Sequence, residues 1–482
     1  MAESSDRTSV LMGEEDRISK LPDALILHIL SFLLTKDVVP TCLLSKRWKF
    51  IWYSVPTLSF SYRTYFQLPG GGKKLRNYVE NCLEQRKRGM QFIPNSAITS
   101  FKLRMKSYKL SHSDGIDKWL AYAVENRVKE ITLELGEGYY YDNDGNYYYY
   151  YYFLPKTLLV NAKFLTILEL MLVELNCSYS FSFPSLKSLT LTLVQFGDKN
   201  VVSELLLGSP SLEKLWFNAC SWSWNIDYNQ QFRIHSSSLK ILKINGSDRV
   251  EQIEAMNLES LELREISFGA INLSVCNAIK NLSLTCHWCV ERSSIEYLIS
   301  NLPLLENLTL SNLKDIGGLK HIKISSQSVK SFNLNNPFDE EVSVIIESAP
   351  NLASLCYIGN IKLKVSMASS NLLNGTFVIL ERHEKYDGDW FINLINFLLN
   401  LNCSWNRVSL HVDSVEALIM PENFKKICRS HLLNWEHLRV FTERQPERHS
   451  DLRDALQWIS PSLKTLSIEK GKSFKNFELN YR

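Results

Sequence analysis

The chain has 482 residues, of which 45% are apolar, and a formal net charge of +3. It is longer than one ordinary hydrophobic core requires, so we expect a small module joined to a large or repetitive domain. So mild a positive charge is no argument for a nucleic-acid partner, and no apolar run approaches the ~18 residues of a membrane span.

The N-terminus is polar and acidic, and it has the pattern of neither a secretory signal nor a transit peptide. We assign residues 1–14 to a disordered N-terminus. The ten cysteines show no framework spacing, which is typical of reduced thiols inside the cell. The sequence therefore predicts a soluble protein of the cytoplasm or nucleus.

Residues 15–62 predict a compact unit of three helices. The first helix begins at Pro22 and is apolar almost all round, the second runs from about Asp37 to Leu44, and the third from Lys46 to Tyr53. So small a unit cannot bury two apolar faces by itself, and we expect one face to stay open to a partner. Pro40 removes a backbone donor, so it should start or kink the second helix.

Two segments of this unit, LPDALILHILSFL and LLSKRWKFIWYSVPTLSF, resemble the F-box in the form that precedes leucine-rich repeats in plant proteins. The resemblance implies that the open face docks on a Skp-type adaptor and, through it, on the cullin and RING subunits of a ubiquitin ligase. The adaptor-binding positions implied for this chain are Leu21, Pro22, Leu25, Ile29, Leu30, Leu43, Leu44 and Trp48. Ala24, Leu34 and Pro40 depart from the family's pattern, and Pro40 would weaken docking if it displaced Leu43 and Leu44. The alternative is a plain helical hairpin packed on the rest of the chain.

After a linker and helical adapter at residues 63–95, the motif LxxLxL recurs through residues 96–360, as in Leu186, Leu189 and Leu191. Between Leu165 and Leu352 the first residues of successive copies lie 19 to 27 residues apart, which is close to the leucine-rich-repeat period of ~20 to 29. Each copy can bury its strand only against neighbours, so the copies should stack. We predict an α/β protein in which a three-helix F-box is followed by a curved leucine-rich-repeat solenoid with a parallel sheet on its concave side.

The segments between the repeat strands predict helices on the convex side. They begin at Asp117, Lys199, Ser293 and Asp339, and several end at a proline. Cys220 follows Phe217 by three positions, which is the Asn/Cys slot of such repeats, so we expect it to serve packing.

Tyr139 to Tyr152 holds nine tyrosines around an Asp-Asn-Asp-Gly turn and predicts a β-hairpin. Two interpretations of this hairpin are open, a low-complexity insertion and a stacking or recognition surface.

Residues 361–482 predict degenerate repeats and a C-terminal cap. Two segments, EKYDGDWFINLINFLLNLNC and VEALIMPENFKKICRSHLL, have the pattern of amphipathic helices around a strand at Arg407 to Val412.

The residues between the repeat leucines should line the concave sheet, because side chains alternate along a strand. They are polar, mixed in charge and short, and we take as candidate substrate-binding residues Trp216, Asn218, Lys243, Asn245, Glu262 and Arg264. Trp216 is a large aromatic residue of the kind enriched in binding hot spots, and Trp222 and Trp224 could extend the patch. Alternatively, these tryptophans pack against adjacent loops.

The sequence contains no catalytic motif such as HExxH, GxSxG or a phosphate-binding glycine loop, so we expect a non-catalytic protein without a cofactor. Cys286, His287 and Cys289 are a tight group, but a structural zinc site needs about four ligands and we expect no metal. Three functions remain: a receptor that binds a protein target for ubiquitination, a small-molecule-dependent co-receptor on the same scaffold, and a repeat interaction protein with a weakened F-box.

Overall fold

The chain forms two compact units, unit 1 up to Glu174 and unit 2 from Leu175 onward, which are described separately. The computed structural model describes residues 18–62, 71–93, 97–106, 108–136, 139–141, 147–222, 232–246, 250–265, 271–285, 292–312, 321–337, 341–368, 373–383, 385–422, 433–443 and 449–470. Residues 1–14, predicted to be disordered, lie outside these ranges. Within them no helix combines the length and the apolar character that crossing a membrane requires.

Unit 1 begins with the predicted three-helix unit, composed of α1 (Asp23–Ser31), α2 (Thr35–Val38), the 3-10 helix η1 (Val39–Leu43) and α3 (Lys46–Ser54). The second helix changes from α to 3-10 geometry at Val39, and Pro40 occupies the first turn of η1, where its missing backbone donor is tolerated. Ser45 caps α3 by accepting a hydrogen bond from the backbone N–H of Trp48 at 3.3 Å.

A parallel sheet continues unit 1 directly from α3. Strand β1 (Thr57–Ser61) lies inside the segment predicted as the F-box, yet it pairs with β2 (Ser100–Met105), which pairs with β3 (Glu130–Leu135) and then β7 (Ile167–Met171). The connections hold α4 (Gly71–Met90), η3 (Leu110–His112), α5 (Ser113–Glu125), α6 (Lys156–Asn161), and the short paired strands β6 (Tyr152–Phe153) and β8 (Val173–Leu175). The tyrosine-rich segment forms the predicted antiparallel hairpin, β4 (Tyr139–Tyr141) with β5 (Tyr147–Tyr149), and its turn lies outside the described residues.

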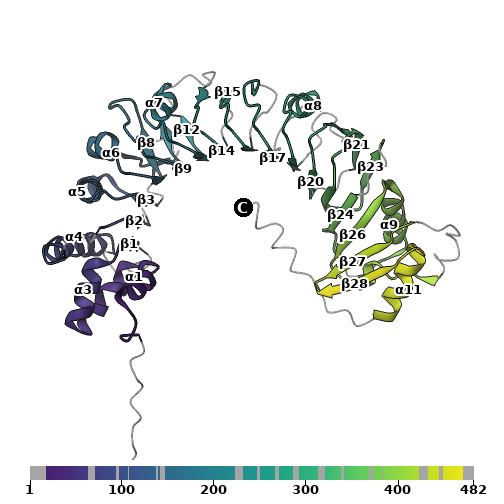
Figure 1. Cartoon of the computed structure of the whole chain (residues 1–482), viewed down its shortest axis with the longest axis horizontal. Helices are drawn as coiled ribbons and strands as arrows, with labels where there is room; N and C mark the ends of the chain where they lie inside the picture. The colour runs from purple at the N-terminus through teal and green to yellow at the C-terminus, as the bar shows by residue number, and fades with distance from the viewer. Residues whose placement is uncertain are drawn as a thin grey trace, which may run out of the picture. The chain divides into compact units, whose positions relative to one another are not determined.

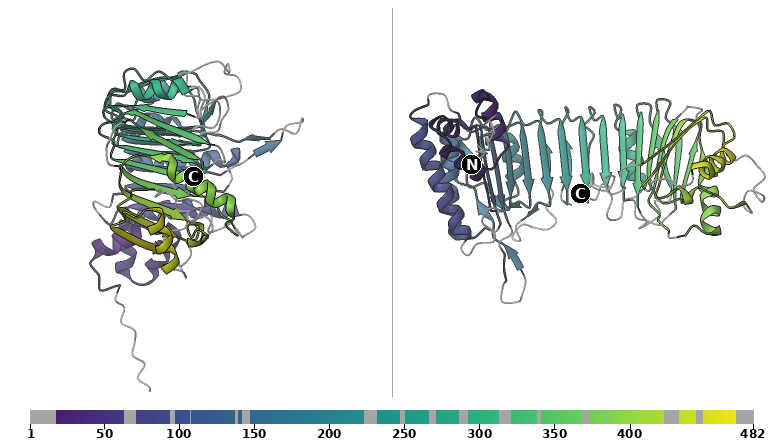
Figure 2. Two further views of the ribbon diagram at one scale, coloured as in Figure 1. Left: turned by 90° about the vertical axis from the view of Figure 1, so that its right-hand side faces the viewer. Right: turned by 90° about the horizontal axis from the view of Figure 1, so that it is seen from below.

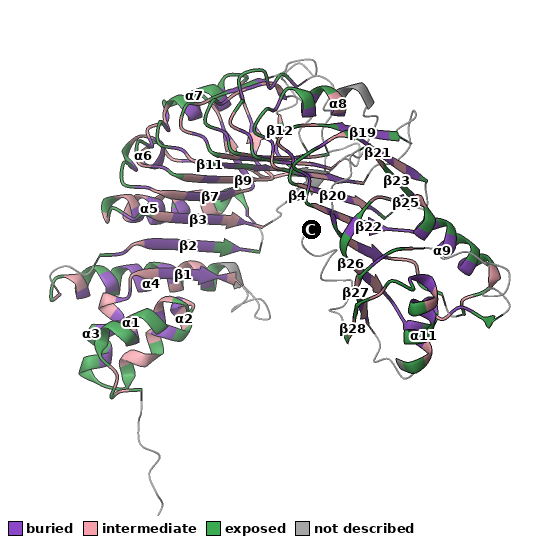
Figure 3. Ribbon diagram, turned by 45° about the vertical axis from the view of Figure 1, so that its right-hand side comes forward, coloured by how far each residue is buried: buried purple, intermediate pink, exposed green. Residues whose placement is uncertain are grey.

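Unit 2 contains a long parallel sheet whose strands run side by side (Figures 1 and 2). The strands follow chain order: β9 (Ser188–Thr192), β11 (Lys214–Asn218), β14 (Ile241–Asn245), β16 (Ser260–Arg264), β17 (Asn281–Thr285), β18 (Asn307–Ser311), β20 (Ser331–Asn336), β22 (Ser354–Gly359), β24 (Leu373–Ile379), β26 (Trp405–Val412), β27 (His437–Thr442) and β28 (Thr465–Lys470). Buried and partly exposed residues alternate along the earlier of these strands, as in β9, β14 and β16 (Figure 3). The repeat leucines face the core, as the α/β solenoid prediction requires.

The outer side of unit 2 contains both helices and short strands. It carries the helices α7 (Val201–Leu207), α8 (Arg292–Ser300), α9 (Gly388–Asn400) and α11 (His449–Ile459), with η5 (Val415–Ala417). Short parallel strands complete it: β10 (Gln195–Phe196) with β12 (Ser221–Trp222), β13 (Phe232–His235) with β15 (Val250–Glu254), and the sheet of β19 (His321–Ser325), β21 (Val342–Ser348), β23 (Leu363–Met367) and β25 (Leu401–Asn402).

The helices predicted from Asp117, Lys199 and Ser293 are confirmed as α5, α7 and α8. The helix predicted from Asp339 is wrong, because that segment forms strand β21. Its residues Val342, Val344 and Ile346 alternate inward, and β-branched side chains favour a strand over a helix. In the C-terminal region α9 and the strand at 407–412 are confirmed. The second predicted helix begins with the three-residue η5, Glu422 is helical, and residues 423–432 of the segment lie outside the described residues.

A left-handed residue ends each of five strands in the first half of unit 2. Leu193, Ala219, Gly246, Glu265 and Asn312 have φ between 50° and 71° and directly follow β9, β11, β14, β16 and β18. The N–H of each donates to a carbonyl at the end of the next strand, for example from Ala219 to Asn245 at 2.9 Å and from Gly246 to Arg264 at 3.0 Å. This turn fixes where these strands stop. The sequence gives no sign of it, because only one of the five positions is glycine.

A ladder of alternating charge precedes the strands of the same region. It consists of Lys187, Glu213, Lys240, Glu259, Lys280, Glu306 and Lys330. The carbonyl of Glu213, for example, accepts hydrogen bonds from the N–H groups of Lys240 and Ile241, both at 2.9 Å. The side chains pair across the repeats, with Lys240 to Glu213 at 3.2 Å and Lys330 to Glu306 at 2.9 Å. Exposed pairs of this kind add little stability each, but their alternating sign favours one register of stacking.

Candidate functional site

The three-helix unit presents an exposed apolar surface. Among the residues predicted to bind the adaptor, Leu25 and Ile29 are 51% and 48% exposed, Leu43 and Leu44 are 86% and 66% exposed, and Pro22 is exposed. Pro40 therefore leaves both of the later leucines accessible. The unit also exposes large apolar residues that the sequence analysis did not single out: Ile18, Phe32, Leu33 and Phe50. Exposed apolar side chains in such number on so small a unit mark an interaction surface.

Two of the predicted contact residues lie inside the unit. Leu30 and Trp48 are each only 5% exposed and pack in the core, while Leu21 is half-buried. The expectation that Leu30 and Trp48 offer their side chains to a partner is corrected accordingly. They support the surface from below, and its accessible part consists of the exposed residues named above.

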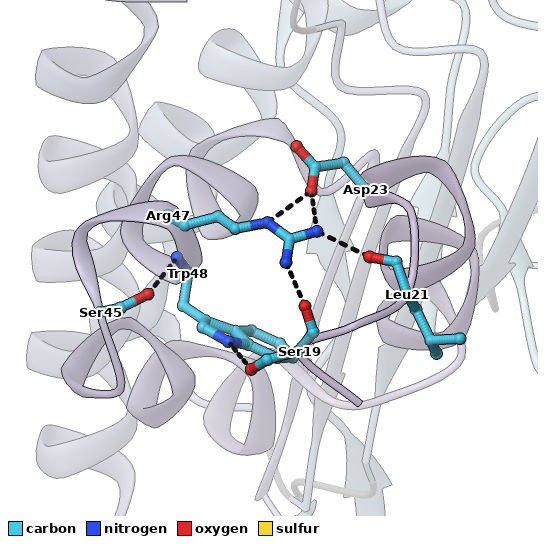
Figure 4. A network of polar contacts seen from close by, with 6 residues as sticks. All are labelled: Ser19, Leu21, Asp23, Ser45, Arg47 and Trp48. Carbon is cyan, nitrogen blue, oxygen red and sulfur yellow. Dashed lines mark hydrogen bonds and ion pairs between the residues drawn. The ribbon is translucent and has the colours of Figure 1, made fainter. Parts of the chain in front are cut away.

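A polar network holds the segment before α1 against α3 (Figure 4). The Arg47 guanidinium donates to the carboxylate of Asp23 at 2.9 Å, to the carbonyl of Leu21 at 2.7 Å and to the carbonyl of Ser19. The indole N–H of Trp48 donates to the hydroxyl of Ser19 at 2.9 Å. The network fixes the backbone that carries Leu21, so this edge of the apolar surface is ordered before any partner binds.

A buried arginine joins the three-helix unit to the rest of unit 1. Arg86 of α4 is fully buried, donates to the carbonyls of Trp52 and Val55 at the end of α3, and lies 5.6 Å from the centroid of the Trp52 ring. Burial lowers the pKa of Arg86 to about 10, and a weaker interaction with Tyr122 opposes that shift. The three-helix unit is thus attached rigidly to α4.

Close packing reinforces this attachment. A Cβ at Gly89 of α4 would collide with the ring of Tyr53 in α3, so only a glycine lets the two helices approach this closely.

The concave face of unit 2 carries the predicted polar residues in register. Trp216 lies opposite Thr190 and Lys243, and Lys243 lies opposite Glu262. Each strand has a second aligned residue two positions later: Asn218, Asn245 and Arg264. All six candidate substrate-binding residues therefore form two adjoining rows on neighbouring strands.

Trp216 is the centre of a charged cluster. Its side chain is 44% exposed, and the Lys243 ammonium lies 5.4 Å from its ring centroid. Glu262 accepts from Lys243 at 2.8 Å and from Arg264 Nε at 2.6 Å. Burial by itself would raise the pKa of Glu262, but these two cations outweigh it and lower the pKa. Beside them, the amide of Asn245 donates to the side chain of Asn218 at 2.8 Å.

The other tryptophans of this region differ from Trp216. Trp222 packs among aromatic rings, with centroids 5.1 Å from Phe196 and 5.5 Å from Phe232, so the packing interpretation holds for it. Trp224 lies outside the described residues.

Cys220 is a packing residue, as expected. It is 6% exposed, and its thiol donates to the carbonyl of Leu191 at 3.4 Å. Burial raises its pKa to about 11, which keeps the thiol protonated and unreactive.

Comparison with known proteins agrees with this geometry. Residues 18–60 match the F-box domain model, residues 95–312 match the model of the At1g61320/AtMIF1 LRR domain, and residues 274–373 match the LRR repeats of the FBD-associated F-box protein At5g56370. The chain is a plant-type F-box/leucine-rich-repeat protein. The three-helix unit is therefore its F-box, and the stacked strands are its leucine-rich repeats.

Several proteins of Arabidopsis thaliana are similar to this chain. The putative FBD-associated F-box protein At3g50710 is 32% identical over 48% of this chain and 49% of its own length. The probable FBD-associated F-box protein At1g32375 is 30% identical over 55% of this chain and 61% of its own length. The putative F-box/LRR-repeat protein At4g15060 is 28% identical over 74% of both chains. The chain thus spans about half to three fifths of the length of the first two relatives.

The leucine-rich repeats also hold an open groove of about 650 Å³ at the strand starts, lined in part by Lys187, Glu213, Lys240, Glu259 and Lys280. Its glutamates pair with lysines of the charge ladder, so the groove does not present a cluster of free basic groups to a small anion.

The cysteine-containing group of Cys286, His287 and Cys289 lies outside the described residues. Among the residues that the structure describes, no group of three His, Cys, Asp or Glu side chains could hold a metal ion.

Proposed function

We propose that this chain is the substrate-recognition subunit of a Skp/cullin/F-box ubiquitin ligase. Its F-box docks on a Skp-type adaptor, and its leucine-rich repeats bind a protein target for ubiquitination. The observation that carries this proposal is the exposed apolar surface of Leu25, Ile29, Leu43 and Leu44 on a unit that matches the F-box domain.

The energetics favour a docking role for that surface. Burying a leucine or isoleucine side chain contributes roughly 1.5 to 3 kcal/mol, so several such residues can offset the loss of translational and rotational freedom on binding. Because the Arg47 network already orders the backbone of Leu21, docking does not have to order that segment.

The rigid attachment of the F-box suits a receptor that works by proximity. Arg86 and the contact of Gly89 with Tyr53 keep the F-box from swinging on a flexible linker. Because the F-box and the repeats belong to one chain, a target bound on the repeats is brought near the ligase scaffold, which raises the effective concentration of its lysines. The chemistry belongs to the other subunits, and this chain contributes no catalytic residue.

The test is co-purification of the full chain with a plant Skp-type adaptor, measured by size-exclusion chromatography. We expect a one-to-one complex that is lost in a Leu25→Ala/Ile29→Ala/Leu43→Ala variant, whose changes are all exposed and should leave the F-box folded. The control is Leu207→Ala/Met256→Ala/Leu304→Ala, which removes similarly exposed apolar residues from the repeats and should keep the complex.

Either of two results would contradict the proposal. If the folded wild-type chain binds none of several adaptors, the F-box surface serves another partner and the repeats act as an interaction protein. If the control variant loses the adaptor as completely as the F-box variant does, the contact lies elsewhere.

A further inference from the structure

The cluster around Trp216 has a surface chemistry that narrows the kind of target the repeats can hold. We name it the Trp216 patch and define it as Lys214, Trp216, Asn218, Lys243, Glu262 and Arg264 on strands β11, β14 and β16. Its single carboxylate, Glu262, is outnumbered by the three cations Lys214, Lys243 and Arg264, so the patch carries a net positive charge.

Glu262 is less exposed than the two cations that pair with it. Its side chain is 16% exposed, against 42% for Lys243 and 23% for Arg264. One carboxylate oxygen accepts from Lys243 and the other from Arg264, so both are used. The part of the patch that meets solvent is therefore mainly cationic.

Lys214 adds a second accessible ammonium. It is exposed and lies two residues before Trp216, on the same face of β11. Its cross-strand neighbours are Ser188 and Ile241, which carry no charge, and no acidic side chain of the described residues pairs with it. With Lys243 it places ammonium groups on two adjacent strands beside a half-exposed indole.

Resting on the receptor function proposed above, we propose that the Trp216 patch binds an acidic segment of the target protein, in which an aspartate or glutamate lies beside a large apolar side chain. The carboxylate bonds to the ammonium groups of Lys214 and Lys243, and the apolar side chain packs on the Trp216 indole. Charge complementarity selects the segment, and the indole supplies the central apolar contact that is typical of binding hot spots.

The donors that the patch offers favour a carboxylate over a phosphate. Arg264 pairs through both Nε and Nη2 with Glu262, so its guanidinium fork, which is the group best suited to bidentate phosphate binding, is already occupied. A nucleic acid would need a longer series of cations along the sheet, whereas the next aligned positions are Ser283 and Thr285.

The experiment uses the full chain and a displayed library of random dodecapeptides. Selections run in parallel on the wild type, on Lys214→Gln/Trp216→Ala and on the control Lys199→Gln/Tyr297→Ala, which alters an exposed lysine and an exposed aromatic residue outside the parallel sheet. We expect the wild type and the control to enrich peptides with Asp or Glu next to an apolar residue, and the patch variant to lose that enrichment.

An enriched peptide is then synthesised with a fluorescent label, and its affinity is measured by anisotropy. Lys214→Gln alone should weaken binding about fivefold to tenfold, Lys214→Arg should retain most of it, and added salt should weaken it by screening the charges. Replacing the peptide's acidic residues by their amides should weaken binding to a similar extent.

Two outcomes would overturn the inference: no enrichment of acidic residues on the wild type, or equal enrichment on the patch variant. Adaptor co-purification is measured for every variant, so these outcomes are separable from a failure of the receptor function. Neutral peptides that still bind the repeats would leave the receptor proposal standing and refute the acidic one.

Discussion

The first and second halves of the unit 2 sheet reach the same fold by different local rules. Strands β9 to β18 on the concave sheet each have five residues, and a left-handed residue follows β9, β11, β14, β16 and β18. The corresponding strands from β20 to β28 have six to eight residues, and within the described part of that half no residue has a positive φ. A tight turn thus sets a uniform strand length in the first half, and without it the later strands extend.

The concave faces of the two halves differ in the same way. In the first half the second concave row is polar, as at Asn218, Asn245 and Arg264. In the second half the equivalent positions of β22, β24, β26 and β27 hold Ile358, Val378, His411 and Phe441, and Ile358 and Val378 are buried in an apolar cluster. The first and last strands of this half keep a polar residue there, Asn335 on β20 and Glu469 on β28. Regular repeats therefore present their strand residues to a partner, whereas the later ones use part of that face for internal packing.

The core of the second half compensates for a missing leucine. Gly375 takes a core-facing position of β24, where a Cβ would lie 2.7 Å from the ring of Trp405 and 2.8 Å from that of Phe377. Trp405 on β26 fills the space, 5.4 Å from Phe377 between ring centroids, and its indole N–H donates to the carbonyl of Leu401 at 3.3 Å. A large side chain on one strand thus replaces the side chain that its neighbour lacks.

The largest expected effect is that of Trp405→Ala, set against Trp216→Ala in the first half. Trp405 is 7% exposed, so its removal should leave a cavity and lower the free energy of unfolding by about 3 to 5 kcal/mol. Trp216 is 44% exposed, and its removal should lower that free energy by less than about 1 kcal/mol. Urea unfolding, with hydrogen exchange to locate the opening in a repeat protein, measures both. Equal losses would show that the two tryptophans do not differ in role.

Gly375→Ala should destabilise the second half by about 1 to 3 kcal/mol, because the added methyl group meets two packed rings. Trp405→Leu removes the ring that the new methyl group would meet. The double variant Gly375→Ala/Trp405→Leu should therefore lose less stability than the sum of the two single losses. A double-mutant cycle from urea unfolding measures this coupling. Strict additivity would refute the exchange of volume between β24 and β26.

The pairing of Gly375 with Trp405 also explains why the sequence predicted the earlier repeats better than the later ones. The leucine spacing predicted the solenoid, because a buried strand position accepts few types of side chain and leaves a regular pattern. The pattern fades where Gly375 and Trp405 exchange volume, since neither residue alone has the form of a repeat. Residues such as Leu193 and Glu265 give no sign of their left-handed backbone, which is stabilised by the hydrogen bond that each makes to the next strand.

The F-box surface was predictable in part for a related reason. A run of apolar residues shows that a helix is buried on more than one side, but it does not say which side the chain itself covers. Ile29 and Leu30 are adjacent and both apolar, yet one is 48% exposed and the other 5%. Only the packing of α1 on α3 separates a docking residue from a core residue.

The response to pH should also separate the two halves. Burial lowers the pKa of His411 to about 4 from its ordinary value of 6.5, and its ring stacks on Phe441 with centroids 4.4 Å apart. Between these values the unfolded chain binds a proton that the folded chain does not, so stability should fall as the pH drops from 6.5 toward 4. We expect a loss of about 1 to 2 kcal/mol, reduced by the solvent around a half-buried ring.

His411→Phe keeps the stack and should flatten this part of the pH profile of urea unfolding. In the first half, the lowered pKa of Glu262 means that its contribution is lost only at pH values below the ordinary carboxylate range. If the stability of His411→Phe falls as steeply between pH 6.5 and 4 as that of the wild type, His411 is not the titrating group.

The smallest expected effects come from the left-handed turns and test them directly. Gly246→Ala adds a Cβ that meets nothing closer than 3.6 Å at a backbone φ of +71°, so its cost is the backbone strain alone, about 1 kcal/mol. Ala219→Gly relieves the same strain one repeat earlier and should change stability by up to about 1 kcal/mol in the opposite direction, less the entropy that glycine gains on unfolding. Thermal unfolding of both variants, beside Gly375→Ala, measures the difference. If Gly246→Ala is as damaging as Gly375→Ala, then crowding rather than backbone conformation limits both halves, and the turn does not set the strand length.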